Sequence, residues 1–150
     1  DPDRTPDPLR LIGRLPRGCA VVLRHFGRAD WIAQAPEIAR ATRLGGHVLL
    51  VAADARLALE IGAAGVHWPQ ARLGEASRWR SRLPLMTAAV HDAGAIRRAG
   101  RPLGPWRAGA LARLSRVPVH ALGGVDHEKA RRLAGLGFSG IACVEALASA

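Results

Sequence analysis

The chain has 150 residues, of which 49% are hydrophobic, and 22 basic against 12 acidic side chains give it a net charge of +10. This composition is able to bury a core and suits one domain over residues 1–150, which excludes an intrinsically disordered tail. The longest apolar stretches, such as Val48 to Ala53, are far shorter than the roughly 20 residues of a membrane span, so we predict no membrane segment.

The positive charge comes almost entirely from arginine. Lys129 is the single lysine, and the arginines are spread along the chain rather than gathered in one tract. Aromatic side chains for base stacking are sparse, with no Tyr, two Phe and four Trp. We therefore expect no specific nucleic-acid binding, although a basic nucleic-acid-associated domain remains a minor alternative.

The cysteines and the first residues of the chain indicate in which cellular compartment the protein resides. Cys19 and Cys143 lie inside apolar runs without a CxxC pattern, which favours two buried thiols over a disulfide or a zinc site. The segment Asp1 to Pro8 is acidic and proline-rich, unlike a signal peptide. A cytoplasmic protein is the expectation.

From about residue 19 onward, short apolar runs alternate with amphipathic stretches, which is typical of a parallel α/β fold. Each run is almost continuously apolar, as a strand covered on both faces must be. The predicted strands are Cys19–Leu23, His47–Ala52, Gly65–Trp68, Leu85–Ala89, Val117–Leu122 and Ser139–Val144. The predicted helices are Ala29–Leu44, Ala55–Gly62, Gly74–Arg82, Asp92–Ala99, Pro105–Arg116 and Asp126–Leu136, the last with Asp126 as its N-cap.

Two helix-to-strand corners share one glycine pattern. Gly62 and Gly137 stand where a helix should end, and Gly65 and Gly140 follow three residues later, where a strand should begin. This repeat favours a TIM (β/α)8-barrel type, although six strands are visible where a full barrel has eight. Exposed strand edges of such an incomplete barrel predict a homo-oligomer.

Ligands of parallel α/β folds bind where the strands end, so the residues that follow each run are candidate site residues. Arg24 would offer a fixed cation to a phosphate, or else form a salt bridge at the rim. His67 and His91 are candidate acids or bases, with a structural role as the alternative for each. Gly123-Gly124 would present backbone N–H groups to a phosphate or form an ordinary turn.

Several of these stretches resemble the thiamine phosphate synthase family and its thiazole tautomerase relatives. The Gly-Val-His-x-x-Gln and Gly-Gly-Val pieces are the most specific. The matching stretches are Val21-Val22-Leu23-Arg24, Leu57-Ala58-Leu59 through Gly65-Val66-His67-Trp68-Pro69-Gln70, Val90-His91, Val119-His120-Ala121-Leu122-Gly123-Gly124-Val125, and Gly140-Ile141-Ala142-Cys143-Val144-Glu145-Ala146-Leu147.

The resemblance implies a barrel that couples a hydroxymethylpyrimidine diphosphate to a thiazole phosphate and releases pyrophosphate with Mg²⁺, or that performs a related thiazole step. By the same resemblance, Arg24 would face the diphosphate, and His67 and Gln70 would lie near the pyrimidine. Gly123 and Gly124 would hold the thiazole phosphate on their N–H groups. The implied partner is therefore a small phosphorylated heterocycle.

The chain departs from the family pattern at the expected metal ligands. Ala52-Ala53 replaces an Asn-Asp pair, with Asp54 one place late as a weak metal candidate, and Ala71-Arg72 replaces an acidic pair. Compared with the family pattern, we expect the first strand of the barrel to be missing, and also the sixth, for which we find no counterpart between residues 99 and 101. The alternative function is a catalytically degenerate paralogue that still binds a phosphorylated heterocycle.

Overall fold

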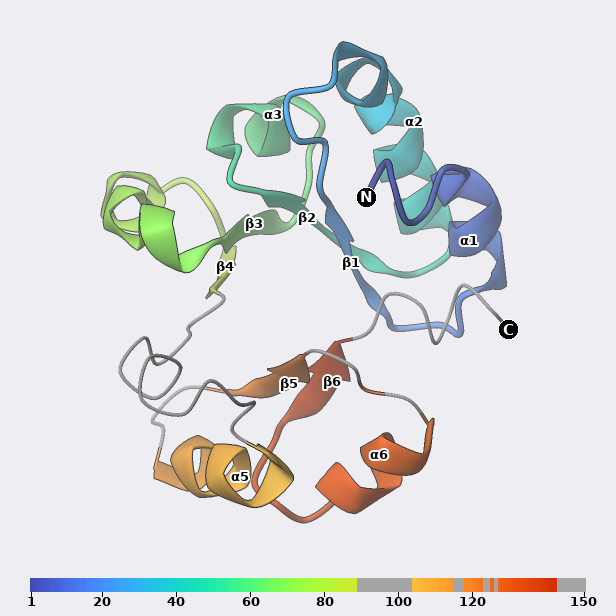
Figure 1. Cartoon of the computed structure of the whole chain (residues 1–150). Coiled ribbons are helices and arrows are strands. Elements are labelled where there is room, and N and C mark those ends of the chain that lie inside the picture. The colour runs from blue at the N-terminus through green and yellow to red at the C-terminus, as the bar shows by residue number, and fades with distance from the viewer. Residues whose placement is uncertain (89–103, 115–117, 123–124, 126, 143–150) are drawn as a thin grey trace. The chain divides into compact units, whose positions relative to one another are not determined.

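The structure is a computed structural model that describes residues 1–88, 104–114, 118–122, 125 and 127–142 (Figure 1). The chain divides into two compact units, Asp1–Val90 and His91–Ala150, called here the first and the second unit. Each is described by itself. Within the described residues, no helix has the length and apolar character needed to cross a bilayer.

The first unit is built on a parallel sheet with the strand order β1-β2-β3-β4. The continuous apolar runs of the sequence predicted all four strands, which end where expected or one residue before. This confirms the α/β class with a parallel sheet, while closure into a barrel stays a prediction. The strands are β1 (Ala20–Leu23), β2 (Val48–Ala52), β3 (Gly65–Trp68) and β4 (Leu85–Ala88).

Three α-helices accompany this sheet: α1 (Pro8–Arg14), α2 (Ala29–Leu44) and α3 (Ala55–Glu60). The bounds of α2 are those predicted, and α3 begins at the predicted residue. Sequence analysis missed α1, although its start carries a recognisable signal. The Asp7 side chain accepts a hydrogen bond of 3.0 Å from the Arg10 backbone N–H, and Pro8 occupies the first helical position.

One face of the sheet forms the core with α2 and α3. Val51 of β2 and Val66 of β3 are fully buried there, packed in one cluster with Ile38 of α2 and Ala58 of α3. Side chains alternate between the two faces of a strand, so the neighbours of these valines point to the opposite face. His67, a candidate site residue of β3, is one of these neighbours.

The helix predicted at Gly74–Arg82 differs from the observed one in its type and in its first residue. A 3₁₀-helix, η1 (Gln70–Trp79), follows β3 directly, and its first turn closes with a 2.9 Å bond from the Arg72 N–H to the Pro69 carbonyl. Gly74, taken as the helix start, lies in the middle of η1. Because a 3₁₀-helix has three residues per turn, side chains three apart stand directly above one another.

The second unit contains α5 (Gly104–Leu114), β5 (His120–Leu122), α6 (His127–Leu133) and β6 (Gly140–Ala142). β5 and β6 pair in parallel, as the sequence predicts for strands in these two places. Gly109 of α5 lies so close to Leu136 that a Cβ atom would come within 2.8 Å of its side chain. The predicted helix Asp92–Ala99 and the predicted N-cap Asp126 lie outside the described residues.

The glycine corners predicted from the sequence are present in both units. Gly62 and Gly137 adopt left-handed conformations with φ of +64° and +98°, and Gly65 and Gly140 begin β3 and β6. Position 65 requires glycine because β3 and β4 approach closely there: a Cβ atom would lie 1.6 Å from the Leu85 carbonyl oxygen of β4.

We predict that Gly65→Ala destabilises the first unit by about 2 to 3 kcal/mol, because the added methyl group forces β4 away from β3. The measurement is the free energy of unfolding by urea. Gly13→Ala in α1 is the control, since a Cβ atom there meets open space. It should be neutral or stabilise by roughly 0.5 to 1 kcal/mol. Equal effects of the two substitutions would contradict the close approach of β3 and β4.

Candidate anion-binding site at the carboxyl ends of the strands

The sheet register brings two predicted site residues to the same level. Leu23 pairs with Val51 and Ala52 pairs with His67, so Arg24, directly after β1, is level with Ala52 and His67. We call the region where the strands of the first unit end, with the residues that follow them, the carboxyl edge. Arg24 and His67 therefore lie at one edge, as the sequence predicted for residues that end parallel strands.

His67 is half-buried and held by a neighbour. Its Nδ1 atom lies 2.9 Å from Oγ1 of Thr87, the residue opposite it on β4. Burial lowers the pKa of the imidazole below its ordinary value of 6.5, and the positive charge of Arg24 lowers it further. His67 is therefore a neutral hydrogen-bonding group near pH 7 rather than a second cation.

Arg24 forms a salt bridge at the rim, one of the two roles considered for it. Its guanidinium forms a rim ion pair with Asp1, with Nη1 3.4 Å from Oδ2, and its side chain keeps 45% of its surface exposed. It also lies over the Phe26 ring, 4.6 Å from the ring centre. The Asp1 side chain keeps only 11% of its surface exposed, so this ion pair is open to solvent, and to an anionic ligand, on the arginine side.

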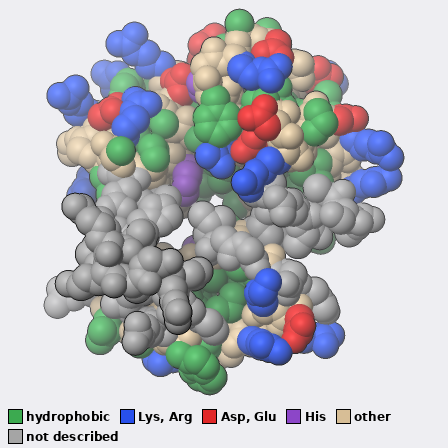
Figure 2. Space-filling view, in the orientation of Figure 1, with side chains coloured by type: hydrophobic (Ala, Val, Ile, Leu, Met, Phe, Trp, Pro, Cys, Tyr) green, Lys and Arg blue, Asp and Glu red, His purple; other side chains and the backbone are tan. Residues whose placement is uncertain are grey.

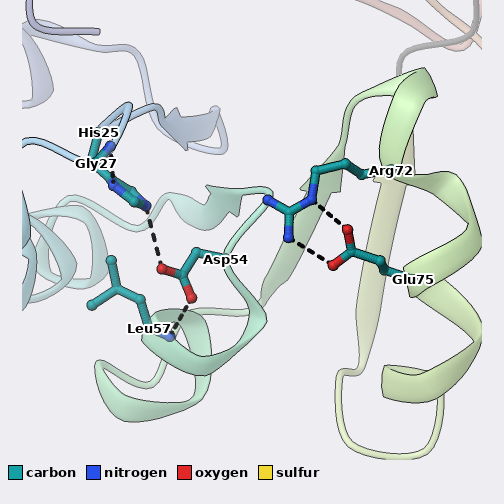
Figure 3. A network of polar contacts seen from close by, with 6 residues as sticks. All are labelled: His25, Gly27, Asp54, Leu57, Arg72 and Glu75. Atoms are coloured by element: carbon teal, nitrogen blue, oxygen red, sulfur yellow. Dashed lines mark hydrogen bonds and ion pairs between the residues drawn. The ribbon is translucent and has the colours of Figure 1, made fainter.

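A second polar network joins the ends of β1 and β2 (Figure 3). The Gly27 N–H donates to His25 Nδ1 at 3.1 Å, so the neutral ring carries its proton on Nε2. Nε2 lies 3.6 Å from Oδ2 of Asp54. The other oxygen, Oδ1, accepts a 2.9 Å bond from the Leu57 N–H and caps α3.

Backbone strain accompanies this network. Phe26 and Ala53 have φ of +49° and +56°, and among the described residues they are the two non-glycine positions in the left-handed region. They directly adjoin His25 and Asp54, so the strained turns bring the two side chains face to face. Strain of this kind is concentrated at functional sites, where surrounding structure maintains it.

Arg72 and Glu75 of η1 form the third part of the site. Their side chains stand above one another in the 3₁₀-helix and make two hydrogen bonds, Nε to Oε1 at 2.5 Å and Nη2 to Oε2 at 2.7 Å. The guanidinium lies between Glu75 and Asp54 (Figure 3), and both carboxylates contribute to raising its pKa, the hydrogen bonds with Glu75 most of all.

The described residues do not fit the Mg²⁺ that the resemblance implies. No group of three His, Cys, Asp or Glu side chains suited to a metal exists among them. Asp54, the one metal candidate from the sequence, has Oδ1 committed to the cap of α3 and Oδ2 facing His25. Mg²⁺ needs oxygen ligands in octahedral geometry, and the nearby Arg72 cation opposes a second positive charge.

Two residues that sequence analysis did not select also belong to this region. His25 Nε2 and Trp68 Nε1 are buried nitrogen atoms without a hydrogen-bond partner, and both residues lie where a strand ends or just beyond it. Trp68 was interpreted as packing, and its near-complete burial agrees with that.

Four predicted site residues are not placed by the structure. His91, Gly123 and Gly124 lie outside the described residues, and of Gln70 the backbone alone is described, at the start of η1. These four assignments stay predictions.

Basic side chains do not gather into one patch on the face of the first unit that Figure 2 shows. They are dispersed, and several stand beside acidic side chains. This distribution agrees with the arginines being spread along the sequence.

We predict that Arg24→Gln raises the pKa of His67 while leaving it below 6.5, because burial, the larger cause of the lowered value, remains. NMR titration of the imidazole protons measures this, with Arg40→Gln on the exposed side of α2 as the control. Because protonation of His67 opposes folding, the free energy of unfolding should fall as pH decreases through 6.5, less so in Arg24→Gln. An unchanged pKa would show that the charge of Arg24 does not act on His67.

Comparison with solved structures identifies the type of fold. No protein-family model matches the sequence, and no curated protein does. Among solved structures, the chain is similar to the thiamine phosphate pyrophosphorylase from Pyrococcus furiosus, with a TM-score of 0.81 and 18% sequence identity. The similarity covers 100% of this chain and 85% of that one. The chain therefore has a thiamine phosphate synthase-like α/β fold, which confirms the resemblance seen in the sequence at the level of the fold.

Proposed function

We propose that the chain binds the phosphate ester of a small heterocycle, of the thiazole phosphate or thiamine phosphate type, at the carboxyl edge of the first unit. The observation that carries this proposal is the pairing of an exposed arginine with a half-buried neutral histidine on one level of the sheet. Arg24 supplies the positive charge, and His67 supplies a hydrogen bond without adding charge. The fold similarity supports the choice of ligand class.

The chemistry of these two residues suits a phosphate. A guanidinium presents a planar fork of N–H donors that matches two phosphate oxygens, and its bonds to an anion are stronger than neutral ones. The rim contact of Arg24 with Asp1 is loose at 3.4 Å and the guanidinium is open to solvent, so a phosphate can bind its exposed side while Asp1 stays in place. The neutral imidazole of His67, anchored at Nδ1 by Thr87, leaves Nε2 as the ring nitrogen for a ligand.

The coupling reaction is the second candidate function, favoured by the fold similarity. It would join a hydroxymethylpyrimidine diphosphate to a thiazole phosphate: the thiazole nitrogen forms a bond to the pyrimidine methylene carbon as the carbon–oxygen bond to pyrophosphate breaks. Mg²⁺ would stabilise the departing pyrophosphate. Because the described residues do not fit that metal, we place binding before coupling.

The test of binding is calorimetric titration of the chain with thiamine phosphate and with thiazole phosphate. Arg24→Ala should weaken binding by about tenfold or more, since one charge-assisted contact to the phosphate is lost. Arg40→Ala removes the same charge from α2 and should leave the affinity unchanged. Undiminished affinity in Arg24→Ala would overturn the site, and absence of binding to both compounds would overturn the function.

The test of coupling is product formation. The chain, a hydroxymethylpyrimidine diphosphate and thiazole phosphate are incubated with MgCl₂, and thiamine phosphate is assayed. We expect turnover far below that of the Pyrococcus furiosus thiamine phosphate pyrophosphorylase assayed in parallel. Turnover comparable to that enzyme would show that coupling is the function and that a metal site is completed by residues other than those described.

A further inference from the structure

We propose that Arg72 is a second anion-binding residue of the carboxyl edge, that Glu75 occupies it in the absence of ligand, and that a phosphate group binds by displacing Glu75 without the help of a metal ion. This inference rests on the proposed function of the same site. It assigns a role to a side chain that was read from the sequence only as a departure from a family pattern.

The Arg72 guanidinium is accessible from solvent, and its neighbours limit its orientation. Arg72 and Glu75 keep 46% and 40% of their side-chain surface exposed, so solvent and ligands reach the pair. The guanidinium carbon lies 5.9 Å from the centre of the Trp68 ring, within the range of a cation–π contact. The buried indole of Trp68 thus limits the positions of the arginine head even when Glu75 is released.

The exchange of partners is energetically accessible. Both hydrogen bonds of Arg72 run to one carboxylate that carries a single negative charge and stands in solvent. The two-pronged geometry makes the pair stronger than most exposed ion pairs, but both side chains stay accessible to solvent and to a competing anion. A phosphate monoester or pyrophosphate offers the same two-pronged geometry with more negative charge, so it binds the guanidinium more strongly than Glu75 does.

The surroundings favour a guanidinium over a metal ion as the cation for the ligand. Asp54 lies beside Arg72 at the start of α3, with Oδ1 bonded to the Leu57 N–H and Oδ2 3.6 Å from the His25 ring. No second or third carboxylate joins Asp54 in a metal-binding group among the described residues, and its charge partly balances that of Arg72. Binding of a phosphate by Arg72 should accordingly need no Mg²⁺.

The experiment is calorimetric titration with inorganic pyrophosphate, in excess EDTA and in excess MgCl₂. We expect binding in EDTA and no gain of affinity from Mg²⁺. Arg72→Ala should weaken binding in EDTA by about tenfold. Glu75→Gln should strengthen it by about threefold, because the neutral amide competes less well for the guanidinium. Arg40→Ala is the charge-matched control, and thermal unfolding verifies that each variant is folded.

Unchanged affinity in Arg40→Ala, which lowers the net charge as Arg72→Ala does, separates this inference from a general effect of net charge. Undiminished affinity in Arg72→Ala, weaker binding in Glu75→Gln, or binding that requires Mg²⁺ would each overturn the role of Arg72 while leaving Arg24 and the proposed function intact. Absence of pyrophosphate binding by the unaltered chain, together with absence of thiamine phosphate binding, would instead overturn the proposed function and this inference with it.

Discussion

The candidate site depends on the parallel pairing of β2 with β3. Ala52 stands opposite His67, and the Ala53 N–H donates a 3.0 Å bond to the His67 carbonyl, so the chain turns into α3 at a fixed point. That turn places Asp54 as the cap of α3 and faces it toward His25. The close approach of β3 and β4 at Gly65 then sets the level of Thr87, which holds the His67 ring. A shift of one residue in this register would move these side chains to the helix-covered face of the sheet.

The polar groups that gather at this edge form pairs of moderate strength. Arg24 lies near Asp1, Arg72 is bound by Glu75, and the His25 ring faces Asp54. Both guanidinium groups are accessible to solvent, and so is the Glu75 carboxylate, whereas the Asp1 side chain keeps only 11% of its surface exposed. The His25–Asp54 contact is more buried and is anchored at both ends by backbone N–H groups. We infer that the His25–Asp54 pair fixes the conformation of the carboxyl edge, while Arg24 and Arg72 contact the ligand.

Sequence reasoning predicted the parts that local pattern determines. Continuous apolar runs are sufficient to locate β1 to β4, and the rule that ligands meet strand ends is sufficient to select Arg24 and His67. The contact of His25 with Asp54 was not predictable, because it depends on left-handed conformations at Phe26 and Ala53, which side chains other than glycine rarely adopt. The partner of Arg72 was missed because an α-helix from Gly74 was expected, whereas a 3₁₀-helix from Gln70 stacks positions three apart.

The central claim is that a phosphorylated heterocycle meets this protein at the carboxyl edge, and amide chemical-shift mapping by NMR tests it most directly. The chain is titrated with thiamine phosphate while backbone amide signals are followed. We expect the largest shifts at Arg24, Asp54, His67 and Arg72, which lie at or just after the ends of β1, β2 and β3. Largest shifts instead around the cavity of about 320 Å³ between α1 and α2, lined by Ile12, Ala41 and His47, would contradict it.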